Sequence, residues 1–273
     1  MINNPGLNKT LYITTGALAL AAGLTGIIDP GMYTRVAGSL LLPGMFSQDL
    51  VVTVTAVVMI VLAIWMRKDD YRKLIVILGI LGFFFYAYGI YSIEQIYTSL
   101  YPLYLAILAL SFYTIIFSMS SLKITAFKDL ELTPVLRYTA SGYAIFISLL
   151  FNFIWISQLV PLLRTGDRIE YTFSVYIIDL VFIMPAFALA ALLALRKRSS
   201  GIIGLPALFI LGAGILSPLA IAELLKPHYY GIEADPGGLI LYSTLSIVFL
   251  ALSALYLALL RPPGHGKDRS DPS

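Results

Sequence analysis

The sequence contains no cysteine, and only two histidines occur among its 273 residues. The missing cysteine excludes disulfide bonds, thiolate nucleophiles, iron–sulfur clusters and cysteine-ligated zinc. His228 and His265 lie outside the long apolar runs, so we expect no histidine-ligated haem and no histidine-rich zinc site within those runs. The residue types therefore indicate no cofactor and no metal site.

Charged residues are also scarce, at 12% of the chain, whereas 59% of the residues are hydrophobic. A water-soluble globule could not bury that much apolar surface, so the composition predicts an integral membrane protein surrounded by membrane lipids. The net charge of +3 is small and gives no reason to expect nucleic acid as a partner. Metalloprotease, Walker-loop and nucleophile-elbow motifs are absent as well, so the sequence indicates no catalytic residue.

The apolar residues are gathered in eight runs, each close to the ~20 helical residues that cross a membrane. We therefore predict an all-α integral membrane protein, an eight-transmembrane-helix bundle that forms a single domain over residues 1–260. The polar segment 261–273 is expected to be a disordered cytoplasmic tail. The predicted helices cover residues 11–28, 50–66, 73–93, 100–119, 138–160, 172–195, 201–224 and 239–260.

The positions of the basic residues predict the orientation, because lysine and arginine near helix ends favour the cytoplasmic side. Most of the 18 basic residues fall on the same side of an eight-helix zigzag as the two termini. We therefore expect a multi-pass protein of the cell membrane with both termini in the cytoplasm. The basic residues expected on the opposite side are Arg35, Arg164, Arg168 and Lys226.

The two halves of the chain show weak similarity at a nearly constant offset, which makes residues 9–120 and 136–260 candidate repeats. Asp49 corresponds to Asp179, and Glu94 corresponds to Glu223. Four helices return the chain to its starting side, so such repeats would be parallel, as in several transport folds. Coincidence is the alternative, because membrane segments draw on few residue types.

Four carboxylates lie within or beside the apolar runs, where ionisable groups cost free energy and usually mark function. Asp179 is furthest from a helix end, and Pro185 after it is expected to kink the helix. The side chains of Tyr88, Tyr91 and Asn152 are expected at a similar depth. We take these three residues and the four carboxylates as candidate ligand-binding residues. The carboxylates are Asp49, Glu94, Asp179 and Glu223.

Further polar side chains share this layer, whereas the cytoplasmic halves of four helices carry no ionisable residue. This one-sided polarity predicts a cavity that opens to the outside above an apolar floor. The additional polar residues include Thr53, Tyr86, Gln158, Tyr176, Ser217 and Tyr242.

Most candidates also have a structural explanation, whereas Asp179 is expected to face a polar interior. Glu94 and Glu223 lie close enough to helix ends to be solvated at the membrane surface, and Asp49 could cap the helix predicted to begin after it. Asn152 could form a hydrogen bond between helices. The tyrosines of the connection after Glu94 are typical of an interfacial aromatic belt, namely Tyr97, Tyr101 and Tyr104.

Four segments between residues 45 and 195 resemble a family of polytopic bacterial membrane proteins. They are FSQDLVV, YAYGIYSIEQ, YLAILALSFY and VYIIDLVFIMPAF. The resemblance implies a bundle of transmembrane helices, and it implies no activity, substrate or site residue.

The leading functional hypothesis is a transporter-like or small-ligand-binding protein. In it Asp179 binds a cation or exchanges a proton, and Tyr88 and Tyr91 face a cationic or amphipathic ligand. A second hypothesis is a noncatalytic subunit or scaffold of a larger membrane complex, or a homo-oligomer. A third is an enzyme acting on a lipid or quinone at the outer leaflet, with Asp179 and Glu94 as an acid–base pair. The absence of a nucleophile or metal set favours a protein that is not an enzyme.

Overall fold

The computed structural model describes residues 4–67, 70–122 and 132–260. Eight helical segments in this part of the chain are long and apolar enough to cross a membrane, as the apolar runs predicted. The predicted tail, residues 261–273, lies outside the described residues. The elements are α1 (Pro5–Ile28), η1 (Pro30–Tyr33), η2 (Ser39–Leu41), α2 (Leu42–Ile64), α3 (Tyr71–Ile93), α4 (Tyr101–Ser120), α5 (Pro134–Thr165), α6 (Phe173–Ile178), η4 (Asp179–Ile183), α7 (Met184–Leu195), α8 (Ser199–Leu225), η5 (Lys226–Tyr230) and α9 (Pro236–Leu259).

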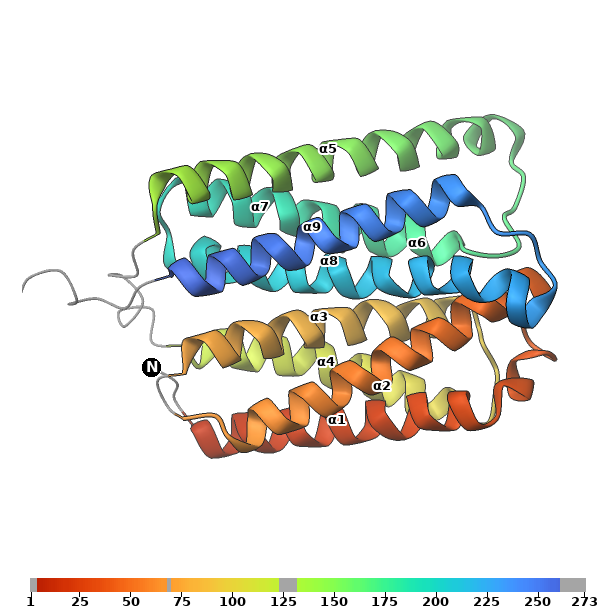
Figure 1. Cartoon of the computed structure of the whole chain (residues 1–273), viewed down its shortest axis with the longest axis horizontal. Coiled ribbons are helices and arrows are strands. Elements are labelled where there is room, and N and C mark those ends of the chain that lie inside the picture. Colours follow the sequence, from red (N-terminus) through yellow and green to blue (C-terminus); the bar gives the residue numbers. More distant parts are fainter. Residues whose placement is uncertain (1–3, 68–69, 123–131, 261–273) are drawn as a thin grey trace, which may run out of the picture.

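The eight long apolar segments, which we call the spanning segments, run up and down in one bundle (Figure 1), so Pro5 and Leu260 lie at the same end of it. We call this the terminal end, and we call the opposite end the distal end. Contacts between helices follow the halves of the chain: α1 packs on α2, α3 on α4, α5 on α7, and α8 on α9. The two halves meet chiefly where α3 lies along α8.

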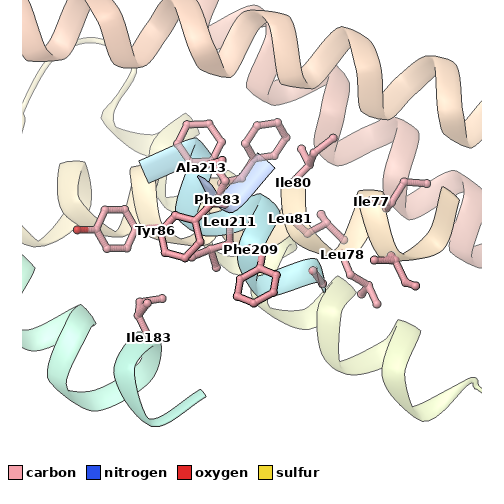
Figure 2. Packing of buried hydrophobic residues seen from close by; sticks show 14 of the residues in the cluster. Ile77, Leu78, Ile80, Leu81, Phe83, Tyr86, Ile183, Phe209, Leu211 and Ala213 are labelled. Atoms are coloured by element: carbon pink, nitrogen blue, oxygen red, sulfur yellow. The ribbon is translucent and has the colours of Figure 1, made fainter. Parts of the chain in front are cut away.

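The core lies between α3 and α8, and α3 is the most deeply buried of the spanning helices. Figure 2 shows the side chains of α3 from Ile77 to Tyr86 beside Phe209, Leu211 and Ala213 of α8. The hydroxyl of Tyr86 points away from this apolar cluster. The polar end of Tyr86 is therefore available to groups outside the α3–α8 contact.

Glycine allows α3 and α8 to approach this closely. A Cβ atom added at Gly79 would lie 2.7 Å from the backbone oxygen of Ala207, and one at Gly214 would lie 2.7 Å from the ring of Phe83. Small residues at helix interfaces are a common means of close packing in membranes. These glycines are thus part of the main contact between the two halves.

Two predicted boundaries are wrong in ways that matter for the site. The second helix begins at Leu42, with Pro43 in its first turn, and not near residue 50. Proline fits a first turn because the N–H that it lacks has no partner inside the helix. Asp49 therefore lies inside α2 and does not cap it. The fifth helix runs from Pro134 to Thr165, and Gly166 ends it with a φ of 75°.

Candidate functional site

Asp179 begins a local widening of the sixth spanning segment. This segment consists of α6, one turn of π-helix from Asp179 to Ile183, and α7. Pro185 has no N–H to donate to the carbonyl oxygen four residues earlier, so regular α-helical bonding cannot pass through this point. Single π-turns inside α-helices occur often at functional sites. The kink predicted near Pro185 therefore takes the form of a π-turn that includes Asp179.

The carboxyl group of Asp179 is buried and only half satisfied. Its side chain is 5% exposed. Oδ2 accepts a hydrogen bond of 2.9 Å from Nε1 of Trp155 on α5. Oδ1 forms no hydrogen bond of ordinary geometry with the described residues, and the hydroxyl of Tyr86 is close enough to contribute a weak hydrogen bond to the carboxyl group. A buried carboxyl group that is incompletely hydrogen-bonded costs free energy, so a donor or cation supplied by a ligand would stabilise it.

Asp179 lines a cavity of about 460 Å³ that reaches toward the distal end of the bundle. Residues of α2, α3, α5, α8 and α9 and of the segment from Tyr171 to Phe187 form its walls, so both halves of the chain contribute. Most of the lining is aliphatic or aromatic. The polar lining residues are Gln48, Tyr86, Tyr91, Glu94, Trp155, Gln158, Tyr171, Thr172, Tyr176, Asp179 and Tyr242.

Glu94 reaches the cavity from the C-terminal end of α3. Its Oε1 accepts a hydrogen bond of 2.8 Å from the backbone N–H of Ser174, in the first turn of α6. A carboxylate at a helix N-terminus satisfies a free N–H group, so Glu94 holds the start of α6 against α3. Beside it, the hydroxyl of Tyr176 donates to Oε1 of Gln158 over 2.8 Å, which links α6 to α5. Polar contacts thus join three helices around the distal part of the cavity.

Aromatic rings close the cavity toward the terminal end. Phe187 and Phe249 line it, and their ring centroids lie 5.8 Å apart. Phe209 packs on both rings, at 6.3 Å from Phe187 and 5.9 Å from Phe249. All three side chains are buried. The cavity therefore has an apolar aromatic floor on the side toward the terminal end.

Asp49 and Tyr88 lie elsewhere, in a closed cluster within the first half of the chain. Oδ2 of Asp49 accepts a hydrogen bond of 2.7 Å from the hydroxyl of Tyr33 on η1. The ring of Tyr88 lies 5.6 Å from the ring of Tyr104, and Tyr104 is fully buried. The expectation that Tyr104 belongs to an interfacial belt is therefore wrong, because its ring faces α3. Tyr91 belongs to both places, since its ring lies 5.1 Å from Tyr104 and it also lines the cavity.

The remaining two candidates make local contacts. Glu223 is buried near the distal end of α8, where it pairs with Lys226 and accepts a hydrogen bond of 2.9 Å from the backbone N–H of Asp235. Asn152 donates to the backbone oxygen of Ser148 one turn earlier on α5. Neither residue lines the cavity. No group of three or more His, Asp or Glu side chains in the described ranges is arranged to hold a metal ion.

Of the seven candidate residues, the cavity brings together Asp179, Glu94 and Tyr91. The sequence analysis did not single out Trp155, which is the hydrogen-bond donor to Asp179. A signal for it was present, because Trp155 and Gln158 are three residues apart, as are Tyr176 and Asp179. Residues three apart share a helix face. The comparisons with protein-family models, curated proteins and solved structures found no match for this chain.

Proposed function

We propose that this protein binds an amphipathic small molecule in the Asp179 cavity. The observation that carries the proposal is that Asp179, a buried acid with an incompletely satisfied carboxyl group, is among the residues that line the cavity. A cationic or hydrogen-bond-donating group of the ligand would satisfy it. Trp155 already donates to Oδ2 and so holds the carboxyl group in place. The carboxyl group would then provide the specificity for a cationic or hydrogen-bond-donating group of the ligand.

The rest of the cavity supports an apolar body for the ligand. Its volume of about 460 Å³ falls within the ~300–1,000 Å³ that small-molecule sites typically occupy. Such sites are mainly apolar with a few placed polar groups, and this lining has the same character. Phe187 and Phe249 offer aromatic faces at the floor, and Tyr86 and Tyr91 offer rings and hydroxyls on the wall formed by α3. Aromatic faces also attract cations, which favours an amine as the polar group.

We also infer that the cavity faces the outside of the cell. Described basic residues of the terminal end include Lys9, Arg67, Arg72 and Arg196, whereas the distal end carries fewer. Basic ends favour the cytoplasm, so the distal end and the cavity would be external. Because the aromatic floor is closed, a ligand would enter and bind from the outside. Transport would require a second conformation in which the rings of Phe187, Phe209 and Phe249 separate.

The helix pairing supports an internal repeat of the kind expected from the sequence. The contact of α1 with α2 matches that of α5 with α7, and the contact of α3 with α4 matches that of α8 with α9. Asp49 and Asp179 would then be equivalent residues. In the first half, tyrosine side chains surround the acid. In the second half, Asp179 lines the cavity, which favours a binding role for Asp179 in particular.

Trp155 provides a direct test of ligand binding. The chain has two tryptophans, and Trp65 is exposed near the terminal end, away from the cavity. In a Trp65→Phe background, all tryptophan fluorescence comes from Trp155, which touches Asp179. Titration with a series of alkyl amines and uncharged alkyl alcohols of equal length should change this fluorescence, and the amines should bind more tightly. Asp179→Asn should weaken amine binding by about 30-fold or more, because losing one partner of a buried charged pair costs ~2–5 kcal/mol.

Glu223→Gln is the matched control, because Glu223 is also a buried acid near the distal end but does not line the cavity. It should leave amine affinity unchanged. Asparagine at position 179 keeps an oxygen that accepts from Trp155, so the local hydrogen bond survives while the charge is lost. Equal affinity of amines for the folded wild-type and Asp179→Asn proteins would overturn the proposal, and so would the absence of any saturable change in fluorescence.

A further inference from the structure

The closed cluster around Asp49 contains a continuous chain of hydroxyl groups that leads to the distal end. Thr98 lies in the connection between α3 and α4, and its Oγ1 is 3.2 Å from the hydroxyl of Tyr104. The hydroxyls of Tyr104 and Tyr33 are 3.3 Å apart, and the hydroxyl of Tyr33 is 2.7 Å from Oδ2 of Asp49. Three hydrogen bonds thus connect a buried carboxyl group to a half-buried threonine beside exposed residues of the connection.

The geometry allows one arrangement in which every hydroxyl donates toward Asp49. Tyr33 uses its only hydrogen for Oδ2 of Asp49, so it must accept from Tyr104. Tyr104 then accepts from Thr98, whose hydroxyl donates to it. Thr98 in turn accepts from the backbone N–H of Leu100 and retains a lone pair for a water molecule. The donors therefore point in the same direction from the connection to the acid.

Asp49 is only 2% exposed, and its surroundings contain no basic side chain among the described residues that interact with it. The titratable groups that face it are all tyrosines: Tyr33 on η1, Tyr88 and Tyr91 on α3, and Tyr104 on α4. From α1 the carboxyl group meets Gly26, where an added Cβ atom would overlap Oδ2. The hydroxyl chain is thus a polar route to this acid from the distal connection between α3 and α4.

We propose that Asp49 is a proton-binding site that exchanges protons with the distal end of the bundle through Thr98, Tyr104 and Tyr33. In the uptake step, a hydronium ion at Thr98 gives up one proton and becomes water. Each hydroxyl accepts a proton from the preceding group and passes its own to the next, and an O–H bond forms at Oδ2 of Asp49. The three hydroxyls are regenerated with reversed orientation, so charge and atoms balance without any further reactant.

The relay requires hydroxyls that keep their protons at rest. Burial, together with the neighbouring Tyr91 and Asp49, raises the pKa of the Tyr33 hydroxyl above its ordinary value. Tyr33 therefore stays neutral at physiological pH and serves as a donor to Asp49. The ring of Tyr91 lies 6.0 Å from the ring of Tyr33 and also lines the ligand cavity. The proton site thus lies directly behind one wall of the cavity, although it does not depend on a ligand binding there.

Infrared spectroscopy of the purified full-length protein tests the relay. A protonated carboxylic acid has a carbonyl stretch that shifts on deuteration, and the band that is lost in Asp49→Asn assigns this group. After rapid mixing with heavy water, the band should shift quickly in the wild-type protein. Tyr104→Phe keeps the ring and removes the middle hydroxyl, so it should slow the shift by about tenfold or more, the effect of a barrier raised by ~1.4 kcal/mol.

Tyr101→Phe is the matched control. Tyr101 begins the same helix, but its hydroxyl donates to the backbone oxygen of Ser92 and takes no part in the chain. This variant should exchange at the wild-type rate. If Tyr104→Phe does not fold, Thr98→Val breaks the chain at its outer end and should slow exchange in the same way. Wild-type exchange rates in folded chain-breaking variants would overturn the proposal, as would a carboxyl band that Asp49→Asn leaves unchanged at every pH tested.

Discussion

Trp155 of α5 and Asp179 of η4 form the polar contact between these two elements at the cavity wall, with Nε1 of the indole 2.9 Å from Oδ2 of the carboxyl group. The aspartate begins a π-turn, and the tryptophan lies on the least buried of the spanning helices. Apart from this bond, α5 packs chiefly on α7. The contact therefore fixes both the position of a weakly packed wall and the orientation of the proposed ligand-binding acid.

Removal of the indole donor should destabilise the folded protein. Trp155→Phe keeps an aromatic ring but removes the donor to Oδ2 of Asp179, and it leaves the carboxyl group with the hydroxyl of Tyr86 as a weak donor. Leaving a buried acceptor unsatisfied costs ~1–3 kcal/mol, so the midpoint of thermal unfolding in detergent should fall clearly. Trp65→Phe is the control, because that tryptophan is exposed, and its midpoint should match the wild type. Equal midpoints for the two variants would contradict a structural role for this hydrogen bond.

Glu94 should act on the start of α6 through its acceptor oxygen. Glu94→Ala removes the partner of the Ser174 N–H, so hydrogen–deuterium exchange should rise in the first turn of α6. Glu94→Gln keeps an oxygen at the same place and should show near wild-type protection. If both variants exchange at the same elevated rate, the negative charge matters more than the hydrogen bond. If neither changes protection, Glu94 does not hold α6.

The bundle could be predicted from the sequence because an apolar run of spanning length indicates a helix regardless of how the helices pack. All eight segments appear near their predicted places. The predicted helix boundaries were wrong where tertiary contacts determine the ends of a helix. Residues 42–49 precede the predicted start of the second helix at residue 50, yet they form the first turns of α2. That extension takes Asp49 from a helix end into the protein interior.

The site was less predictable, because it depends on which faces of separate helices meet. Asp179 could be recognised from its apolar surroundings alone. The partner of Asp49 could not, since Tyr33 enters from the connection after α1 and donates to Oδ2 of Asp49. Glu223 was equally hidden, because its partners Lys226 and Asp235 come from the following turn and connection. The local sequence pattern can indicate that an acid is buried, whereas tertiary contacts determine which groups it pairs with.

The orientation can be tested by labelling, because the chain contains no cysteine. Tyr97 is exposed in a connection at the distal end, and Trp65 is exposed at the terminal end. In intact cells, a membrane-impermeant maleimide should label the Tyr97→Cys protein and should label the Trp65→Cys protein only after the membrane is permeabilised. The opposite pattern would place the cavity on the cytoplasmic side and would overturn the proposed access from outside.

The close approach of α3 and α8 should make Gly79 intolerant of even one added methyl group. A Cβ atom there would lie 2.6 Å from Cβ of Ile210 and 2.7 Å from the backbone oxygen of Ala207, and a backbone atom cannot move aside as a flexible side chain can. Overpacking of this kind costs ~1–3 kcal/mol, more than the ~0.5–1 kcal/mol that alanine gains over glycine within a helix. Gly79→Ala should therefore lower the midpoint of thermal unfolding.

Gly142 offers the matched comparison, because it also lies within a spanning helix but has no atom within 4 Å of an added Cβ. Gly142→Ala should leave the midpoint unchanged or raise it, since only the backbone preference for helix remains. The midpoint of thermal unfolding should therefore change in opposite directions in the two variants. This difference distinguishes the effect of the contact between α3 and α8 from the general effect of glycine on helix stability. A Gly79→Ala protein as stable as the Gly142→Ala protein would mean that the two halves of the chain are not packed as closely as the structure has them.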